Sequence, residues 1–197
     1  MKKAIILLLY VCSCAMAQIQ STADVLGKGK SALFISSNVL VAEDADTATA
    51  SVLQYWRGVS SRVDIFGGVS ITTLPHEKQF GVNGGANINL LKSKWMSVSA
   101  FNMLSTPLHR RTDASATVWF AAGIISHTFG QNGPSVYGGY SATVPLGHTA
   151  ERLFTSAETV HNFPIGIAIP WGKWTIYPEY NYGRTVQTVG IGIAFAP

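Results

Sequence analysis

Residues 80–90 read FGVNGGANINL, and two kinds of side chain alternate along this stretch. One parity carries apolar or small residues: Phe80, Val82, Gly84, Ala86, Ile88 and Leu90. The other parity carries glycine and asparagine and no charge: Gly81, Asn83, Gly85, Asn87 and Asn89. A period of two places successive side chains on opposite faces of a sheet. An apolar face opposite an uncharged polar face is typical of a strand in a lipid-embedded barrel with a polar interior.

Similar strand-length segments run through the rest of the chain. Alternation is clear at 63–71, 165–169 and 189–195, and no helical period competes with it. The segments that we expect to be strands are 30–42, 48–57, 62–72, 80–91, 95–104, 115–128, 135–144, 162–170, 174–182 and 186–195. Their pattern predicts an all-β, up-and-down antiparallel transmembrane barrel of ten strands, with eight as the alternative count.

The connections between these segments alternate in length. Short turns are expected at 58–61, 92–94, 130–134 and 172–173, and mostly longer polar loops at 43–47, 73–79, 105–114 and 145–161. Bacterial outer-membrane barrels have short periplasmic turns and longer outer loops. The short connection 183–185 departs from this rhythm, because it would have to lie on the outer side.

The N-terminus has the features of a secretory signal peptide. Basic residues at Lys2 and Lys3 precede a short apolar run, and Ala15-Met16-Ala17 forms a small-x-small cleavage site. We expect cleavage after Ala17, which makes residues 1–17 the signal and 18–197 a single barrel domain. A lipoprotein signal ending at Cys14 is the alternative. Both cysteines lie in this segment, so the mature chain is expected to have no disulfide.

The composition is apolar and rich in glycine, with 47% hydrophobic residues, 12% charged residues and 19 glycines. Removing Lys2 and Lys3 lowers the 14 basic residues to 12, against 10 acidic ones. This excess is too small to indicate a nucleic-acid partner.

Aromatic residues flank the expected turns. An interface girdle on the short-turn side is predicted from Trp56, Trp95, Trp171, Trp174, Phe129 and Phe195. A second girdle beside the outer loops would contain Phe80, Phe163, Tyr180 and Tyr182. The alternative is that tryptophan simply flanks turns, as it does in any sheet.

The signal, the girdles and the last segment, Val189 to Phe195, resemble small outer-membrane β-barrel proteins of the outer-membrane protein A and opacity type. The resemblance implies outer-membrane lipid, lipopolysaccharide and the barrel-assembly machinery as partners, and the outer membrane of a Gram-negative bacterium as the location. The chain departs from the family pattern where Ala196 and Pro197 follow the terminal aromatic residue. Pro178 is a second departure, since proline inside a sheet lacks a ladder donor.

The strands contain few charged residues. Arg57, Arg62, Asp64 and Glu179 are predicted to face the lumen, because a charge facing lipid at mid-height costs about 2–4 kcal/mol for Arg or Lys. Arg57, Arg62 and Asp64 surround one turn, where they would form an ion-pair plug or the rim of a narrow pore. A surface cluster beside the turn is the alternative.

Little in the sequence points to chemistry. The histidines lack the spacing of a metal site, and we expect no metal and no cofactor. Ser156, Glu158 and His161 are the nearest approach to a nucleophile, carboxylate and base, and we expect no catalytic residues.

The sequence therefore predicts a non-enzymatic membrane barrel that is a structural or surface protein or a narrow, porin-like solute pore. The alternatives are a secreted soluble β-barrel that binds a small apolar ligand and an outer-membrane barrel enzyme that acts on lipid.

Overall fold

The computed structural model describes residues 22–42, 45–73, 78–108, 117–130, 132–146, 159–183 and 186–197. The predicted signal peptide, residues 1–17, lies outside the described residues. No helix in the described ranges is long and apolar enough to cross a membrane.

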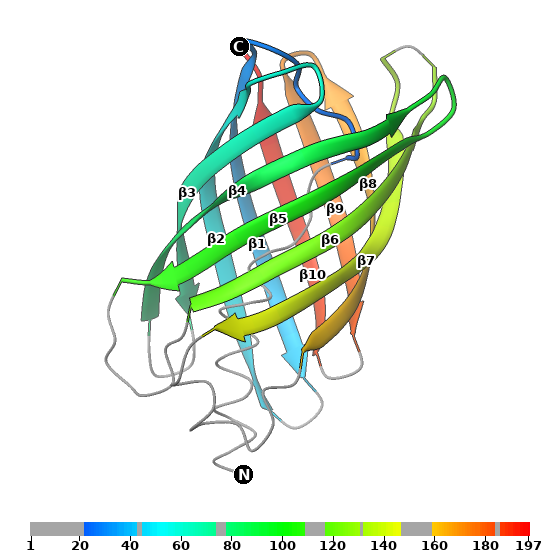
Figure 1. Ribbon diagram of the computed structural model, residues 1–197. Coiled ribbons are helices and arrows are strands. Elements are labelled where there is room, and N and C mark those ends of the chain that lie inside the picture. Colours follow the sequence, from blue (N-terminus) through cyan, green and yellow to red (C-terminus); the bar gives the residue numbers. More distant parts are fainter. Residues whose placement is uncertain are drawn as a thin grey trace.

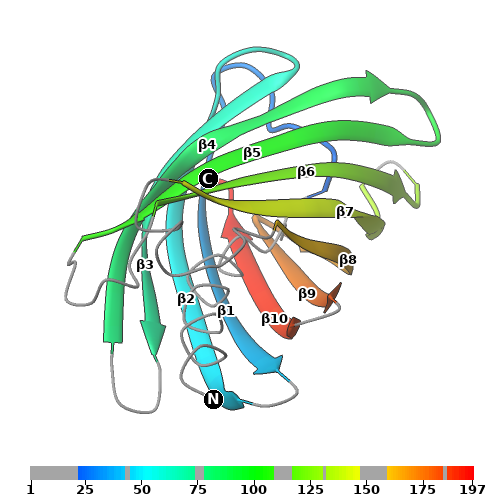
Figure 2. The ribbon, with the colours of Figure 1, turned by 60° about the horizontal axis from the view of Figure 1, so that its bottom comes forward.

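Ten strands form one closed antiparallel barrel (Figures 1 and 2). Each strand pairs with the next one in the chain, and β1 pairs with β10 to close the ring. The strands are β1 (Ser31–Ala42), β2 (Ala45–Gly58), β3 (Val63–Thr73), β4 (Lys78–Lys92), β5 (Ser97–Pro107), β6 (Thr117–Thr128), β7 (Ser135–Leu146), β8 (Val160–Trp171), β9 (Trp174–Gly183) and β10 (Val186–Phe195). The predicted ten-strand, up-and-down, all-β barrel is confirmed, and the eight-strand alternative is excluded.

The barrel has two different ends. One end, called here the short-turn end, carries the connections β2–β3, β4–β5, β6–β7 and β8–β9, the start of β1 and the end of β10. It lies at the top of Figure 1, where the C-terminus is marked. The opposite end, called the loop end, carries the other connections.

The barrel wall is apolar outside and polar over much of its inner face, as the stretch 80–90 predicts. On β4, Asn87 and Asn89 are 1% and 3% exposed, while Ile88 and Leu90 between and after them are 38% and 58% exposed. The same division holds on β8, where Ile165 and Ile167 are exposed and Ala168 is buried. Because side chains alternate with a period of two, the residues of one parity on a strand face the lumen and those of the other parity face outward.

Pro178 does not end β9, although it has no N–H to donate. Pro178 keeps its place in the register opposite Ile191 of β10. On its other side the β8–β9 ladder passes from Gly166↔Glu179 directly to Ile169↔Ile176, so the proline lies in an interrupted part of the ladder. The strain expected from this proline is therefore absorbed locally and does not change the strand count.

Candidate functional site: the closed lumen

The segment before β1, residues 22–29, crosses the short-turn end of the barrel, and we call it the strap. It turns at Gly27 and Gly29, whose φ angles of 89° and 82° lie in the left-handed region that favours glycine. The strap then joins the sheet, since Gly29 N–H donates to Gly58 O at 2.8 Å and Gly58 N–H donates to Lys30 O at 2.9 Å. A Cβ on Gly58 would collide with the carbonyl oxygen of Gly27. The absence of a side chain at Gly58 therefore lets the strap lie against β2.

Backbone groups of the strap bind side chains on the inner wall. Leu26 N–H donates to Asp64 Oδ2 of β3 at 2.8 Å. Further along the strap, Ala23 N–H donates to Ser126 Oγ at 3.2 Å, and Asn89 Nδ2 donates to Ala23 O at 2.8 Å. Ala23 itself is fully buried. These contacts reach β3, β4 and β6, so the strap is bound to the inner face of several strands at the short-turn end.

Asp24 fixes the strap at the rim. Its Oδ1 lies 2.8 Å from Lys92 Nζ and accepts a hydrogen bond of 2.9 Å from Ser97 Oγ. The Lys92 side chain is 61% exposed, so this ion pair contributes little to stability, on the order of 0–1 kcal/mol. Its main effect is to fix the position of the strap relative to the β4–β5 turn.

Below the strap, four inward aromatic rings form a ladder across the wall. Trp56 stacks on Phe66 with centroids 4.4 Å apart, and Phe66 stacks on Phe101 at 5.1 Å. Phe101 meets Phe120 edge-to-face at 5.8 Å. Such pairs add about 0.5–1.5 kcal/mol each beyond their buried area. We call these four residues the aromatic ladder.

Gly85 makes the ladder continuous. It lies on β4 between Phe66 of β3 and Met103 of β5 in the register. A Cβ on Gly85 would lie 2.7 Å from Phe66 Cζ. Because no side chain stands there, the Phe66 ring can extend over β4 and reach Phe101.

The ladder belongs to a hydrophobic cluster that crosses the lumen. The cluster joins the ladder and Ala23 to Phe34 of β1, Met103 of β5 and Tyr137 of β7, and Tyr177 of β9 packs against it. Phe34 of β1 and Tyr177 of β9 meet edge-to-face with centroids 6.0 Å apart, and both line a small cavity together with Trp56. This cavity of about 60 Å³ lies among the strap, Phe34 and Trp56. The strap and the hydrophobic cluster therefore occupy much of the short-turn half of the lumen.

A second buried pair lies on β7 and β9. Tyr137 Oη donates to Glu179 Oε2 at 2.9 Å, and the two side chains are 3% exposed. Tyr137 lies over Gly166 of β8, its register partner, where a Cβ would collide with the phenol ring. Glycine again provides the space for a large inward side chain on the neighbouring strand.

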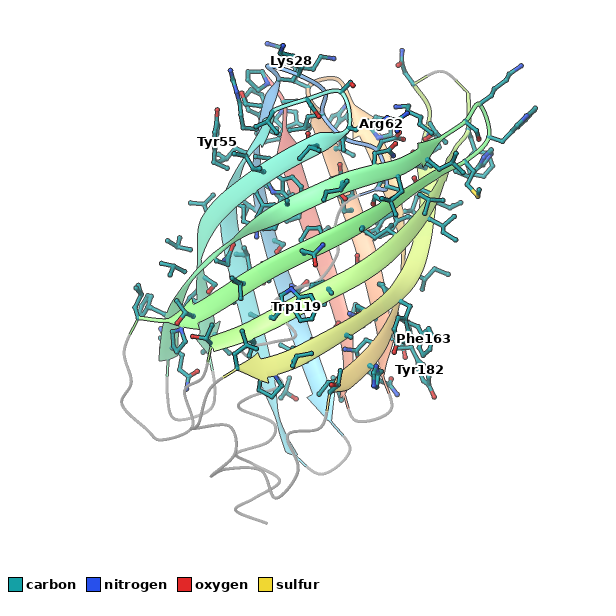
Figure 3. The ribbon with its side chains drawn as sticks, viewed as in Figure 1. Lys28, Tyr55, Arg62, Trp119, Phe163 and Tyr182 are labelled. Atoms are coloured by element: carbon teal, nitrogen blue, oxygen red, sulfur yellow. The ribbon has the colours of Figure 1, made fainter. Side chains whose placement is uncertain are left out.

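Of the four charged residues that were predicted to face the lumen, two do so and two do not. Asp64 and Glu179 point inward and are 2% and 3% exposed. The prediction is wrong for Arg57 and Arg62, which are both exposed. Arg57 shares the outward parity of Tyr55, which Figure 3 shows outside the wall, and Arg62 lies in the β2–β3 turn at the short-turn end. Asp64 therefore binds the strap and does not form the predicted ion-pair plug with these arginines.

The predicted short-turn girdle also needs one correction. Trp56 is 8% exposed and belongs to the aromatic ladder, because its parity on β2 is inward. Trp95, Trp171, Trp174 and Phe129 are exposed at the short-turn end, and Phe195 packs on Trp174 with centroids 4.6 Å apart. At the loop end Phe80, Phe163, Tyr180 and Tyr182 are exposed, and Figure 3 shows Phe163 and Tyr182 pointing away from the wall.

The residues considered for catalysis are not brought together in the described structure. Ser156 and Glu158 lie outside the described residues. His161 stacks on Tyr140 and shares a hydrogen bond with its hydroxyl on the outer face. Among the described residues no three His, Cys, Asp or Glu side chains form a group that could hold a metal ion.

Sequence reasoning missed the strap and the aromatic ladder. The sequence did contain a signal for the ladder, because all four of its residues have inward parity on their strands: Trp56, Phe66, Phe101 and Phe120. Phe34 has inward parity as well. The strap carried no comparable signal, because 22–29 has no periodicity and its contacts join residues far apart in the chain.

No protein-family model matches the chain. No curated protein matches it either. Several solved structures are similar to it. One, described as KdgM porin, is 12% identical, with a TM-score of 0.46, over 83% of this chain and 98% of that one. The attachment invasion locus protein Ail of Yersinia pestis is 15% identical, with a TM-score of 0.38, over 86% of this chain and 99% of that one. The β domain of the Bordetella autotransporter BrkA is 12% identical, with a TM-score of 0.41, over 85% of this chain and 99% of that one.

Proposed function

We propose that this chain is an outer-membrane β-barrel with a closed lumen, and that it works as a structural or surface protein whose loops act outside the membrane. In this proposal the chain is neither an enzyme nor an open pore. The observation that carries the proposal is the hydrophobic cluster that crosses the lumen beneath the strap.

The distribution of side chains supports a membrane location. Large apolar side chains are exposed at mid-height around the wall, for example Ile35, Val69, Ile125, Ile165 and Ile191 at 50–62%. Buried positions include many serine, asparagine and threonine side chains. A soluble protein rarely exposes so large an apolar surface. A soluble ligand-binding barrel would need the opposite arrangement.

The filled lumen argues against free diffusion of solutes. A barrel of about eight strands is already filled by its side chains, and wide aqueous channels require about 16–18 strands. Ten strands leave little more room, and here aromatic rings and the strap occupy it. The loop end then becomes the part of the molecule available to partners.

Planar-bilayer conductance of the mature chain tests this proposal. We expect no steady conductance from the wild type. A variant that lacks residues 18–29 and carries Trp56→Ala and Phe101→Ala is expected to conduct weakly, because it removes both closures. Trp119→Ala is the matched control, since Trp119 is 41% exposed on the outer wall.

Large, stable conductance from the wild type would refute a closed lumen. A separate measurement tests the membrane location: the purified chain should require detergent and should show heat-modifiable migration on a gel. A chain that stays folded and monomeric without detergent would contradict the membrane proposal.

A further inference from the structure

Most of the basic residues in the described ranges lie at the short-turn end of the barrel. Of the basic residues whose side chains the structure describes, all but Lys78 lie there, and all of them are exposed: Lys28, Lys30, Arg57, Arg62, Lys92, Lys94 and Lys173. Lys28 and Arg62 are labelled at this end in Figure 3. The residues come from the strap, from Lys30 next to it, and from three different turns or their flanks, so the positive charge lies around much of the mouth.

The acidic groups described at this end leave most of this charge uncompensated. Asp24 is paired with Lys92 at 2.8 Å, and Asp64 is 2% exposed and binds the backbone of the strap. Neither carboxylate is available to the other basic side chains of the rim. We call Lys28, Lys30, Arg57, Arg62, Lys94 and Lys173 the basic rim.

Exposed tryptophans lie beside the basic rim. Lys94 Nζ lies 5.4 Å from the centre of the Trp95 ring. Trp171 and Trp174 are register partners on either side of the β8–β9 turn, which contains Lys173. Tryptophan favours the membrane–water interface, while an ammonium group remains in the headgroup layer. Together they place the rim at the level of the lipid phosphates.

We infer that the basic rim binds the headgroups of anionic phospholipids in the leaflet at the short-turn end. This inference rests on the membrane location in the proposed function. Clustered Lys and Arg beside a membrane-spanning segment attract anionic lipid. A soluble polyanion drawn into the lumen is less consistent with the geometry, because the strap and the hydrophobic cluster fill the mouth that the rim surrounds.

Tryptophan quenching by brominated lipid tests the inference with the full mature chain in vesicles of phosphatidylcholine and a minority of phosphatidylglycerol. Only one of the two lipids is brominated in each sample. One variant keeps Trp174 alone and a second keeps Trp119 alone, with the other tryptophans changed to Phe. Trp174 reports on the short-turn end, and Trp119, the third residue of β6, reports on the loop end.

We expect brominated phosphatidylglycerol to quench Trp174 at least about twofold more than its share of the vesicle lipid predicts, and salt to reduce this excess. The excess should be absent at Trp119. It should be lost in the variant Lys30→Gln, Arg57→Gln, Lys94→Gln, Lys173→Gln, which leaves the Lys92–Asp24 pair intact, and retained in Lys78→Gln.

Quenching of Trp174 by both lipids in proportion to their amounts would overturn the inference and leave the membrane location standing. Excess quenching that survives the four substitutions would also overturn it. The absence of quenching by either lipid would refute the membrane location, and with it the inference.

Discussion

Asp64 accepts a hydrogen bond of 2.8 Å from the backbone N–H of Leu26, a residue 38 positions earlier in the chain. Asp64 is the first inward residue of β3, and its carboxylate is buried under the strap. A buried carboxylate needs hydrogen-bond donors, and the strap backbone provides one here. The same bond therefore satisfies one oxygen of the carboxylate, Oδ2, and holds the strap at the mouth of the barrel.

Asp64→Ala should loosen the strap. A hydrogen bond to a charged group is worth about 1.5–3 kcal/mol, so hydrogen exchange at the Leu26 amide should accelerate by roughly ten- to a hundredfold. Exchange measured by NMR in detergent checks this. Lys78→Gln is the control, because Lys78 is exposed at the loop end, away from the strap. Unchanged exchange at Leu26 in Asp64→Ala would mean that other contacts hold the strap.

Gly85→Ala should destabilise the barrel by about 1–3 kcal/mol, the usual cost of overpacking. The added Cβ would press on the Phe66 ring and on the carbonyl oxygen of Asn102. Gly123→Ala should be neutral, because nothing lies within 4 Å of a Cβ there. A denaturant titration in detergent measures the two free energies of unfolding.

A double-mutant cycle identifies the role of the Phe66 ring. In a Phe66→Leu background the cost of Gly85→Ala should fall by about 0.5 kcal/mol or more, within the range for residues in contact, while the contact with the Asn102 carbonyl oxygen remains. Strict additivity of the two substitutions would show that the ring does not depend on the space above Gly85.

The sequence predicted the barrel because strand parity is a local property. Alternation in 80–90 was sufficient to place Asn87 inside and Ile88 outside. The predictions for Arg57 and Trp56 are wrong because they gave residue type more weight than parity. Arginine was assigned to the lumen because it is charged, and tryptophan to the girdle because it is aromatic. Parity alone would have reversed both assignments.

The closure of the lumen cannot be predicted from local sequence patterns, because its contacts join residues far apart in the chain. The contact between Ala23 and Ser126 joins residues 103 positions apart, and no periodicity links them. The Phe66–Phe101 contact depends on Gly85, which lies on the strand between them, and so on the register of three strands. Long-range register cannot be read from one strand, and the sequence therefore predicted a polar lumen where the structure has an aromatic cluster.

Tyr137→Phe should destabilise the barrel by about 1–3 kcal/mol, because it removes a hydrogen bond from a buried carboxylate and leaves the packing over Gly166 intact. In a Glu179→Gln background the same substitution should cost less, since the remaining group is neutral. Unfolding titrations of the four proteins measure this difference. An equal cost in both backgrounds would show that the charge of Glu179 is not what the tyrosine stabilises.

Ile167→Arg tests which solvent surrounds the wall. Ile167 is 43% exposed on the outer face of β8 and lies well inside the strand, whereas Leu33, 42% exposed, is the third residue of β1 at the short-turn end. In a bilayer, arginine costs about 2–4 kcal/mol at the midplane and about 0–1 kcal/mol near the interface. Folding titrations into vesicles should therefore show a large loss for Ile167→Arg and a small one for Leu33→Arg. Surface substitutions in water are usually within about 0.5 kcal/mol of neutral, so small and equal effects at the two positions would mean that water, and not lipid, surrounds the barrel.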